Sequence, residues 1–194
     1  MTEYPPAFSE LVEALRQLPS VGPRSAERHA LFLLQAPAAV SEKLASALTR
    51  AKLVDLLNED LAREFQAIIA YVNYSQVLKG AAYMNIADEL AVHAAEELAH
   101  ALILSNQIDY LGGMPTTVPK PVKTSEKAED MLRFDLDNEN ETIRQYRRRI
   151  KQCDELGEFA TAEHIREILL QEQDHQISLA TALGIDVPNV GIAD

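Results

Sequence analysis

Apolar residues recur every three or four positions along most of the chain, and this spacing predicts amphipathic α-helices. Two short helices are expected near the beginning, at residues 9–17 and 24–34, with Ser9 as the N-cap of the first. The segment between them is Leu18-Pro-Ser-Val-Gly-Pro23, whose prolines and glycine break a helix. The first part of the chain is therefore expected to be a helix, a tight hairpin and a second helix.

The next segment has no helix breaker over an unusual length, because no Pro or Gly occurs between Ser41 and Lys79. We expect a third helix at residues 41–51 and a bend near residues 50–53. Four longer helices are then expected, at residues 53–79, 86–111, 125–155 and 158–183. The predicted fold class is therefore all-α.

The lengths of the connections predict how the four long helices are arranged. Residues 80–85 and Gly157 supply short turns, which make the helices on either side antiparallel neighbours. Residues 112–124 contain three prolines and form an extended connection that can run the length of a bundle. The second and third long helices are therefore expected to be parallel in a four-helix bundle with one long crossover.

An internal repeat relates the first pair of long helices to the second pair. Glu97-Leu-Ala-His100 recurs as Glu172-Gln-Asp-His175, and we call the separation of Glu97 from Glu172 the repeat interval. The same interval separates the lone glutamates Glu64 and Glu139, and also the tyrosines Tyr71 and Tyr146. Residues three apart on a helix share a face, so each Glu-x-x-His motif can direct a carboxylate and an imidazole to one point.

Four carboxylates and two imidazoles inside an apolar bundle predict a site for two divalent metal ions, because unpaired buried charges are costly. Glu97 and Glu172 are expected to bridge the two ions, while Tyr71 and Tyr146 orient the carboxylates. Carboxylate and imidazole ligands without thiolate favour iron, with manganese as the alternative metal. The alternative to a metal site is a bundle whose Glu and His side chains face solvent. The six expected metal ligands are Glu64, Glu97, His100, Glu139, Glu172 and His175.

Composition favours a cytoplasmic helical protein. Of the 194 residues, 47% are hydrophobic, which is ample for one packed domain and a small appendage. No signal peptide is visible, and no apolar run reaches the roughly 20 residues that span a bilayer, so no membrane segment is expected. Cys153 is the only cysteine, which excludes an intrachain disulfide and suits a reducing compartment.

Residues 53–183 resemble the ferritin-like superfamily, and bacterioferritin most closely. The resemblance rests on Glu64-Phe-Gln-Ala-Ile-Ile-Ala-Tyr71, on Glu96-Glu97-Leu-Ala-His100 with the later Leu-Gly-Gly-Met-Pro115, and on Leu-Asp-Asn-Glu139. It implies a ferroxidase that oxidises Fe(II) with dioxygen or peroxide at a di-iron centre. It also implies storage of ferric mineral in a shell of subunits, and hence a homo-oligomer of at least two chains. A di-iron peroxidase or oxidase of rubrerythrin type is the alternative enzyme, although no Cys-x-x-Cys module is present.

The remaining expectations concern haem binding and the histidines outside the six expected metal ligands. Leu98 stands where haem-binding bacterioferritins have a haem-ligating Met, so no haem is expected at that position. His93, one turn before the second-helix motif, and its neighbour Glu96 are expected as an accessory or entry site for iron. His29 and His164 are interpreted as ordinary histidines.

The N-terminal hairpin segment, Leu18-Pro-Ser-Val-Gly-Pro-Arg-Ser-Ala26, resembles the helix-hairpin-helix of the recombination mediator RecR, with Ser20 in place of the first hairpin glycine. The resemblance covers residues 8–51 and implies contact with the DNA backbone. A second function is therefore expected as an alternative, a DNA-associated protein that protects nucleic acid from iron and peroxide. Residues 1–52 have six Lys or Arg and five Asp or Glu, a near balance that also suits a helical cap or oligomerisation module. The expected domains are residues 1–52 and 53–194, and the expected DNA contacts are Val21, Gly22, Arg24 and Arg28.

Overall fold

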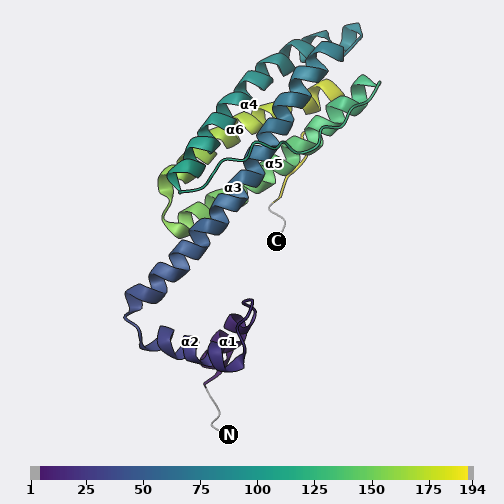
Figure 1. Ribbon diagram of the computed structural model, residues 1–194. Helices are drawn as coiled ribbons and strands as arrows, with labels where there is room; N and C mark the ends of the chain where they lie inside the picture. The colour runs from purple at the N-terminus through teal and green to yellow at the C-terminus, as the bar shows by residue number, and fades with distance from the viewer. Residues whose placement is uncertain (1–4, 192–194) are drawn as a thin grey trace. The chain divides into compact units, whose positions relative to one another are not determined.

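The fold is known from a computed structural model, which describes residues 5–191 (Figure 1). Within this range the secondary structure is entirely helical, which confirms the expected all-α class. The chain divides into two compact units, Met1–Leu48 and Thr49–Asp194, and each is described by itself. The elements in order are α1 (Pro6–Arg16), α2 (Pro23–Gln35), α3 (Ala38–Val77), the 3-10 turn η1 (Ala81–Tyr83), α4 (Met84–Tyr110), α5 (Ala128–Leu156) and α6 (Phe159–Leu183).

The first unit contains the expected helix, hairpin and helix. Helix α1 begins at Pro6, before the expected Ser9, because proline is well suited to the first turn of a helix. The apolar side chains of Phe8, Ala26 and Ala30 are buried between α1 and α2. In the hairpin Ser20 has a φ of 66°, a left-handed conformation that costs a residue with a side chain about 1–2 kcal/mol. This strain explains why a glycine suits that position.

Helix α3 is longer than either helix expected in its place. A single helix runs from Ala38 to Val77 and continues through residues 50–53, where the sequence predicted a bend between two helices. The continuity has a simple cause, since the range contains neither proline nor glycine, the two residues that interrupt helices most strongly.

The second unit is a four-helix bundle built from the later part of α3 with α4, α5 and α6 (Figure 1). Contacts between α3 and α5 run in opposite chain directions, because Asp60 contacts Arg149 while Tyr71 contacts Glu139. Helices α4 and α6 are antiparallel in the same way, because Thr161 contacts Gln107 while Ser178 contacts Glu89.

The long crossover between α4 and α5 follows the surface of α3. Asn58 donates a hydrogen bond to the carbonyl oxygen of Met114, and the Lys120 amide donates to the carbonyl oxygen of Ala62 at 2.9 Å. Farther along, Tyr74 donates to the carbonyl oxygen of Lys123. The crossover thus carries the chain from one end of the bundle to the other, so that α4 and α5 are parallel.

Close packing at the start of the crossover requires Gly113. A Cβ atom at this position would lie 2.3 Å from the Val54 side chain on α3, well inside van der Waals contact. Gly113 therefore lets the crossover leave α4 directly against α3.

Two apolar clusters fill the bundle, one towards each end. The first includes Leu57, Leu104 and Ile165, together with the buried free thiol of Cys153, whose pKa burial raises to about 11. The second includes Leu90 and Leu132. Polar side chains are buried between the two clusters, and they form the site described next. None of the helices over residues 5–191 is apolar enough over the length needed to cross a membrane.

Candidate metal centre

Six buried side chains meet in the middle of the bundle, and they are the six that the repeat predicted. All four helices contribute, and each of these side chains is 1–2% exposed. Helices α4 and α6 each supply a Glu-x-x-His pair from one face, as the spacing of three residues requires. The residues are Glu64 from α3, Glu97 and His100 from α4, Glu139 from α5, and Glu172 and His175 from α6.

Their ligand atoms form two overlapping groups, each within 4.8 Å. We call the group of Glu64, Glu97, His100 and Glu172 the His100 half, and the group of Glu97, Glu139, Glu172 and His175 the His175 half. In the first, His100 Nδ1 lies 3.1 Å from Glu97 Oε2 and 3.2 Å from Glu172 Oε1. In the second, His175 Nδ1 lies 2.8 Å from Glu97 Oε1. Glu97 and Glu172 belong to both halves, which is the arrangement that two bridging carboxylates require.

The two predicted tyrosines each hold a carboxylate on another helix. The Tyr71 hydroxyl donates a hydrogen bond to Glu139 Oε1, and the Tyr146 hydroxyl donates to Glu64 Oε1. Each lone glutamate is thereby bound by the tyrosine of the other repeat, which fixes one oxygen and leaves the second directed to the centre.

Burial and mutual repulsion dominate the electrostatics of the centre. Burial raises the pKa of the Glu139 carboxyl well above its ordinary value, and the neighbouring charge of Glu172 raises it further. Burial also raises the pKa values of Glu64, Glu97 and Glu172. Although burial opposes protonation of His175, its hydrogen bond with Glu97 and the nearby carboxylates raise its pKa to about 9. The protein therefore holds protons where positive metal charge would serve the same purpose.

Several ligand atoms that face the centre have no hydrogen-bond partner among residues 5–191. A buried polar atom without a partner is costly, and most native structures avoid it. Two cations, one in each half, would give these atoms partners, so the donor set fits a pair of metal ions. The atoms are Glu64 Oε2, Glu139 Oε2 and Glu172 Oε1.

Each histidine of the centre also contacts an outer partner through Nε2, and the two partners differ. His175 Nε2 lies 2.9 Å from Glu96 Oε2, whereas His100 Nε2 lies 2.7 Å from the amide oxygen Oε1 of Gln171. Glu96 was singled out from the sequence, but Gln171 was not. The repeat interval also separates Glu96 from Gln171, so the repeat contained this signal. The two halves are thus equivalent in their ligands and unequal in their surroundings.

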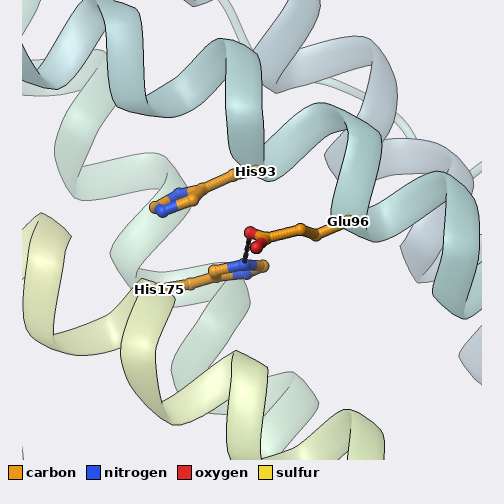
Figure 2. Close-up of side chains that lie close together, drawn as sticks. All are labelled: His93, Glu96 and His175. Carbon is orange, nitrogen blue, oxygen red and sulfur yellow. Dashed lines mark hydrogen bonds and ion pairs between the residues drawn. The ribbon is translucent and has the colours of Figure 1, made fainter.

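His93 lies against the His175 half (Figure 2). Its ring stacks on the His175 ring with centroids 4.0 Å apart. The side chain is almost fully buried, and burial together with His175 lowers the pKa of His93 to about 4. His93, Glu96 and His175 form a third group whose ligand atoms lie within 4.8 Å of one another. The expected accessory residues are therefore beside the centre, and they share His175 with it.

A buried ion pair adjoins the centre and was not predicted. Arg149 on α5 donates to Asp60 on α3 at 2.7 Å, and both residues are 1–2% exposed. The repeat interval relates Asp60 to Asp135. Asp135 is buried, and its Oδ2 atom has no hydrogen-bond partner within the described part of the chain. Burial and the charge of Glu139 raise the pKa of Asp135 well above its ordinary value.

The residues expected to contact DNA lie in the first unit and form a separate group. Val21 and Gly22 belong to the hairpin, and Arg24 and Arg28 are exposed on α2. The two arginines line a shallow depression of about 460 Å³ together with the exposed ring of Phe32. Their position is compatible with the predicted surface contact.

Comparisons with known proteins match the bundle to one family. Residues 54–186 match the ferritin-like domain family. A bacterioferritin of Desulfovibrio desulfuricans is 32% identical over 143 residues, which cover 73% of this chain and 79% of that protein. A ferritin-like, diiron-carboxylate protein from Bacillus anthracis superposes with a TM-score of 0.67 at 32% identity, over 70% of this chain and 97% of the other. The crystal structure of the D. desulfuricans bacterioferritin, described with a diiron site, gives a TM-score of 0.66 at 30% identity, over 72% of this chain and 82% of that one.

The N-terminal segment matches a different family. Residues 8–52 match the helix-hairpin-helix of RecR. The recombination protein RecR of Synechocystis is 53% identical over 51 residues, which cover 26% of this chain and 22% of that protein. This match to RecR lies within the N-terminal segment of the chain. Both expected resemblances are confirmed.

Proposed function

We propose that this chain, which belongs to the ferritin-like family, is a di-iron ferroxidase that oxidises Fe(II) with dioxygen or peroxide and contributes to iron storage. The observation that supports this proposal most strongly is the meeting of six buried ligands from four helices in two overlapping groups. The bacterioferritin and diiron-carboxylate relatives support the same class of activity.

The residues would hold two metal ions as the two halves suggest. Glu64 and His100 would bind one ion and Glu139 and His175 the other, and the two shared glutamates would bridge them. Four carboxylates would balance the charge of two divalent ions, and oxygen with imidazole ligands suits iron and also admits manganese. Two bound iron ions would supply the one-electron steps through which Fe(II) substrate becomes Fe(III).

The surrounding protein controls geometry and protons. Tyr71 and Tyr146 each hold one oxygen of a lone carboxylate, and buried apolar clusters lie at both ends of the centre. Glu96 and Gln171 would accept hydrogen bonds from the outer nitrogens of the histidines if the inner nitrogens held metal. This arrangement fixes the imidazole tautomer that a metal ligand needs.

Stopped-flow measurement of Fe(II) oxidation tests the proposed activity. Glu97→Ala removes a ligand from both halves, so the rate is expected to fall at least about a hundredfold, the upper end of the loss caused by removing a group that only orients a ligand. His93→Ala removes no ligand of the centre and is expected to have a much smaller effect at saturating Fe(II). The matched control is Glu167→Ala, an exposed glutamate on α6. Equal losses in Glu97→Ala and the control would contradict the proposal.

The same assay with dioxygen and with hydrogen peroxide separates the two enzyme classes. A ferroxidase is expected to accumulate Fe(III) in proportion to the Fe(II) supplied, well beyond two ions per chain. A peroxidase of rubrerythrin type, the alternative enzyme, would instead consume peroxide repeatedly with only the bound ions cycling.

Assembly and haem content are further parts of the proposal. Leu98 and Leu102 on α4 are 52% and 65% exposed, and such neighbouring apolar side chains suit burial in a homo-oligomer of at least two chains. Leu98 offers no haem ligand, so no haem is expected at this position. Size-exclusion chromatography with light scattering measures the assembly, and a monomer at micromolar concentration would contradict the oligomer.

DNA binding through the first unit is a second candidate function, favoured by the match of residues 8–52 to the RecR hairpin. The hairpin amides near Val21 and Gly22 would contact phosphate oxygens, with Arg24 and Arg28 adding positive charge. The bundle would then be held near DNA that it protects from iron and peroxide.

Gel-shift titration of the full chain with duplex DNA tests this second function. The double variant Arg24→Ala and Arg28→Ala is expected to weaken binding at least tenfold and to flatten its salt dependence. The control is Arg133→Ala, an exposed arginine on α5. Unchanged binding in the double variant, or no binding by the natural chain at low salt, would contradict the function.

A further inference from the structure

We propose that His93, Glu96 and His175 form a third divalent-cation site at the outer edge of the His175 half, where Fe(II) is held before it enters the centre. This inference rests on the di-iron function proposed above. It concerns a site that the centre itself does not require, since His93 and Glu96 are not among its six ligands.

The three side chains converge from two helices (Figure 2). His93 and Glu96 are three residues apart on α4, and His175 faces them from α6, with ligand atoms within 4.8 Å. The Nδ1 atom of His93 is buried and has no hydrogen-bond partner within residues 5–191. A nearly fully buried imidazole with an unused nitrogen, beside a carboxylate and a second imidazole, is a donor set suited to Fe(II).

The site opens to the surface through a depression of about 250 Å³. Besides the three ligands, the depression is lined by the acidic residues Glu89 and Asp174. Glu96 is partly exposed, with 34% of its side chain accessible, while His175 is buried behind it. A cleft with negative charge attracts cations and raises their local concentration. The depression therefore leads from solvent to the ring of His175, whose other side faces the centre.

The ring of His175 connects the third site to the centre. Its Nε2 atom lies 2.9 Å from Glu96 Oε2, and its Nδ1 atom lies 2.8 Å from Glu97 Oε1. A neutral imidazole has one free lone pair, so it can bind a cation through only one nitrogen at a time. When Nε2 binds the outer cation, Nδ1 carries the proton and donates to Glu97. When Nδ1 binds the inner cation, Nε2 donates to Glu96, so filling the His175 half weakens the outer site.

The other end of the centre lacks these features. The repeat interval relates His93 to Ile168 and Glu96 to Gln171. Ile168 has no ligand atom, and the neutral amide of Gln171 replaces the carboxylate beside the outer nitrogen of His100. Within residues 5–191 the proposed site therefore exists at one end only. The residues at these repeat-related positions define two test substitutions, His93→Ile and Glu96→Gln.

Crystals of Glu139→Gln soaked anaerobically in Mn(II) provide the test. The substitution removes one anionic ligand from the His175 half and keeps an acceptor for Tyr71, so His175 becomes available to the outer cation. Anomalous difference density is expected beside His93, Glu96 and His175. Adding His93→Ile or Glu96→Gln is expected to remove this density.

The matched control is His164→Ile in the same Glu139→Gln background. His164 and Glu167 are also three residues apart on a helix, with Nδ1 3.5 Å from Oε2, but both side chains are exposed. The control is expected to keep the density. The proposal is overturned if Glu139→Gln shows no outer density while the His100 half is filled, or if the density survives His93→Ile. Failure of the proposed di-iron function would appear differently, as an empty His100 half in the unsubstituted protein.

Two solution measurements test the same site without crystals. In equilibrium dialysis, Glu139→Gln with His93→Ile is expected to bind one Mn(II) fewer per chain than Glu139→Gln alone. In the otherwise natural chain, His93→Ile is expected to slow Fe(II) oxidation at limiting Fe(II) by roughly tenfold. This is the lower end of the increase in association rate that a charged cleft provides. Equal Mn(II) binding, or an unchanged rate at limiting Fe(II), would contradict the third site.

Discussion

Tyr146 on α5 donates a hydrogen bond to Glu64 on α3, and both side chains are almost completely buried. The same contact recurs between Tyr71 and Glu139. Each tyrosine therefore joins the two halves of the repeat and restrains one terminal carboxylate of the proposed centre.

Replacing this tyrosine tests how far its hydroxyl positions the carboxylate. Tyr146→Phe leaves one oxygen of Glu64 without its donor, which is expected to weaken metal binding about 10–100-fold, as for other groups that orient a ligand. Isothermal titration with Mn(II) measures the change. Tyr110→Phe, at a tyrosine that is 70% exposed, is the control. An affinity in Tyr146→Phe equal to that of the control would contradict this role.

Removing one partner of the buried pair of Asp60 and Arg149 is expected to destabilise the bundle much more than replacing both partners with apolar residues. Arg149→Met leaves the Asp60 carboxyl buried without its partner and is expected to lower the free energy of unfolding by about 3–5 kcal/mol. Arg149→Met combined with Asp60→Leu is expected to recover most of that loss, because no buried charge remains. Urea unfolding measures both variants. A double variant less stable than the single one would show that the pair itself stabilises the bundle.

The pH dependence of stability should have opposite signs with and without metal. The pKa of His175 is raised to about 9 from 6.5, and that of Glu139 is raised from 4.5. Both groups bind protons more tightly when folded, so their contribution is complete below the unfolded pKa values and is lost as pH rises through the folded ones. The metal-free protein is therefore expected to lose stability from about pH 5 to pH 9.

Metal competes with those protons, so its stabilising effect should grow with pH. At a hundredfold excess over the dissociation constant, binding adds about 2.7 kcal/mol. Thermal melts with and without Mn(II) between pH 5 and 8 measure the two trends. A melting temperature indifferent to Mn(II) at every pH would favour a bundle without a buried metal site.

The sequence was most informative where the chain repeats itself. Helical spacing and the repeat interval were sufficient to select Glu64, Glu97 and their partners, because a bundle with twofold pseudo-symmetry must bring such positions together. The crossover could be predicted from the glycines and prolines of residues 112–124 alone, because these residues end helices. The continuity of α3 was missed, since periodicity alone does not show whether a long helix is interrupted.

The surroundings of the centre were harder to predict, because they depend on contacts between helices. Nothing local to Gln171 shows that it would face His100, and nothing local to Arg149 shows that it would pair with Asp60 across the bundle. Comparing all positions at the repeat interval would have found Asp60 and Asp135 as a pair. The comparison would not have shown that Asp60 pairs with an arginine while Asp135 lies beside Tyr74, because the two positions differ in their surroundings.

Anomalous diffraction from crystals of the natural chain soaked anaerobically in Fe(II) tests the di-metal centre most directly. Two peaks are expected, one among Glu64, His100 and the shared glutamates and one on the side of Glu139 and His175. Both peaks should be lost in Glu97→Ala crystals. Saturating soaks that leave no iron among these six side chains would contradict a di-iron centre in this bundle.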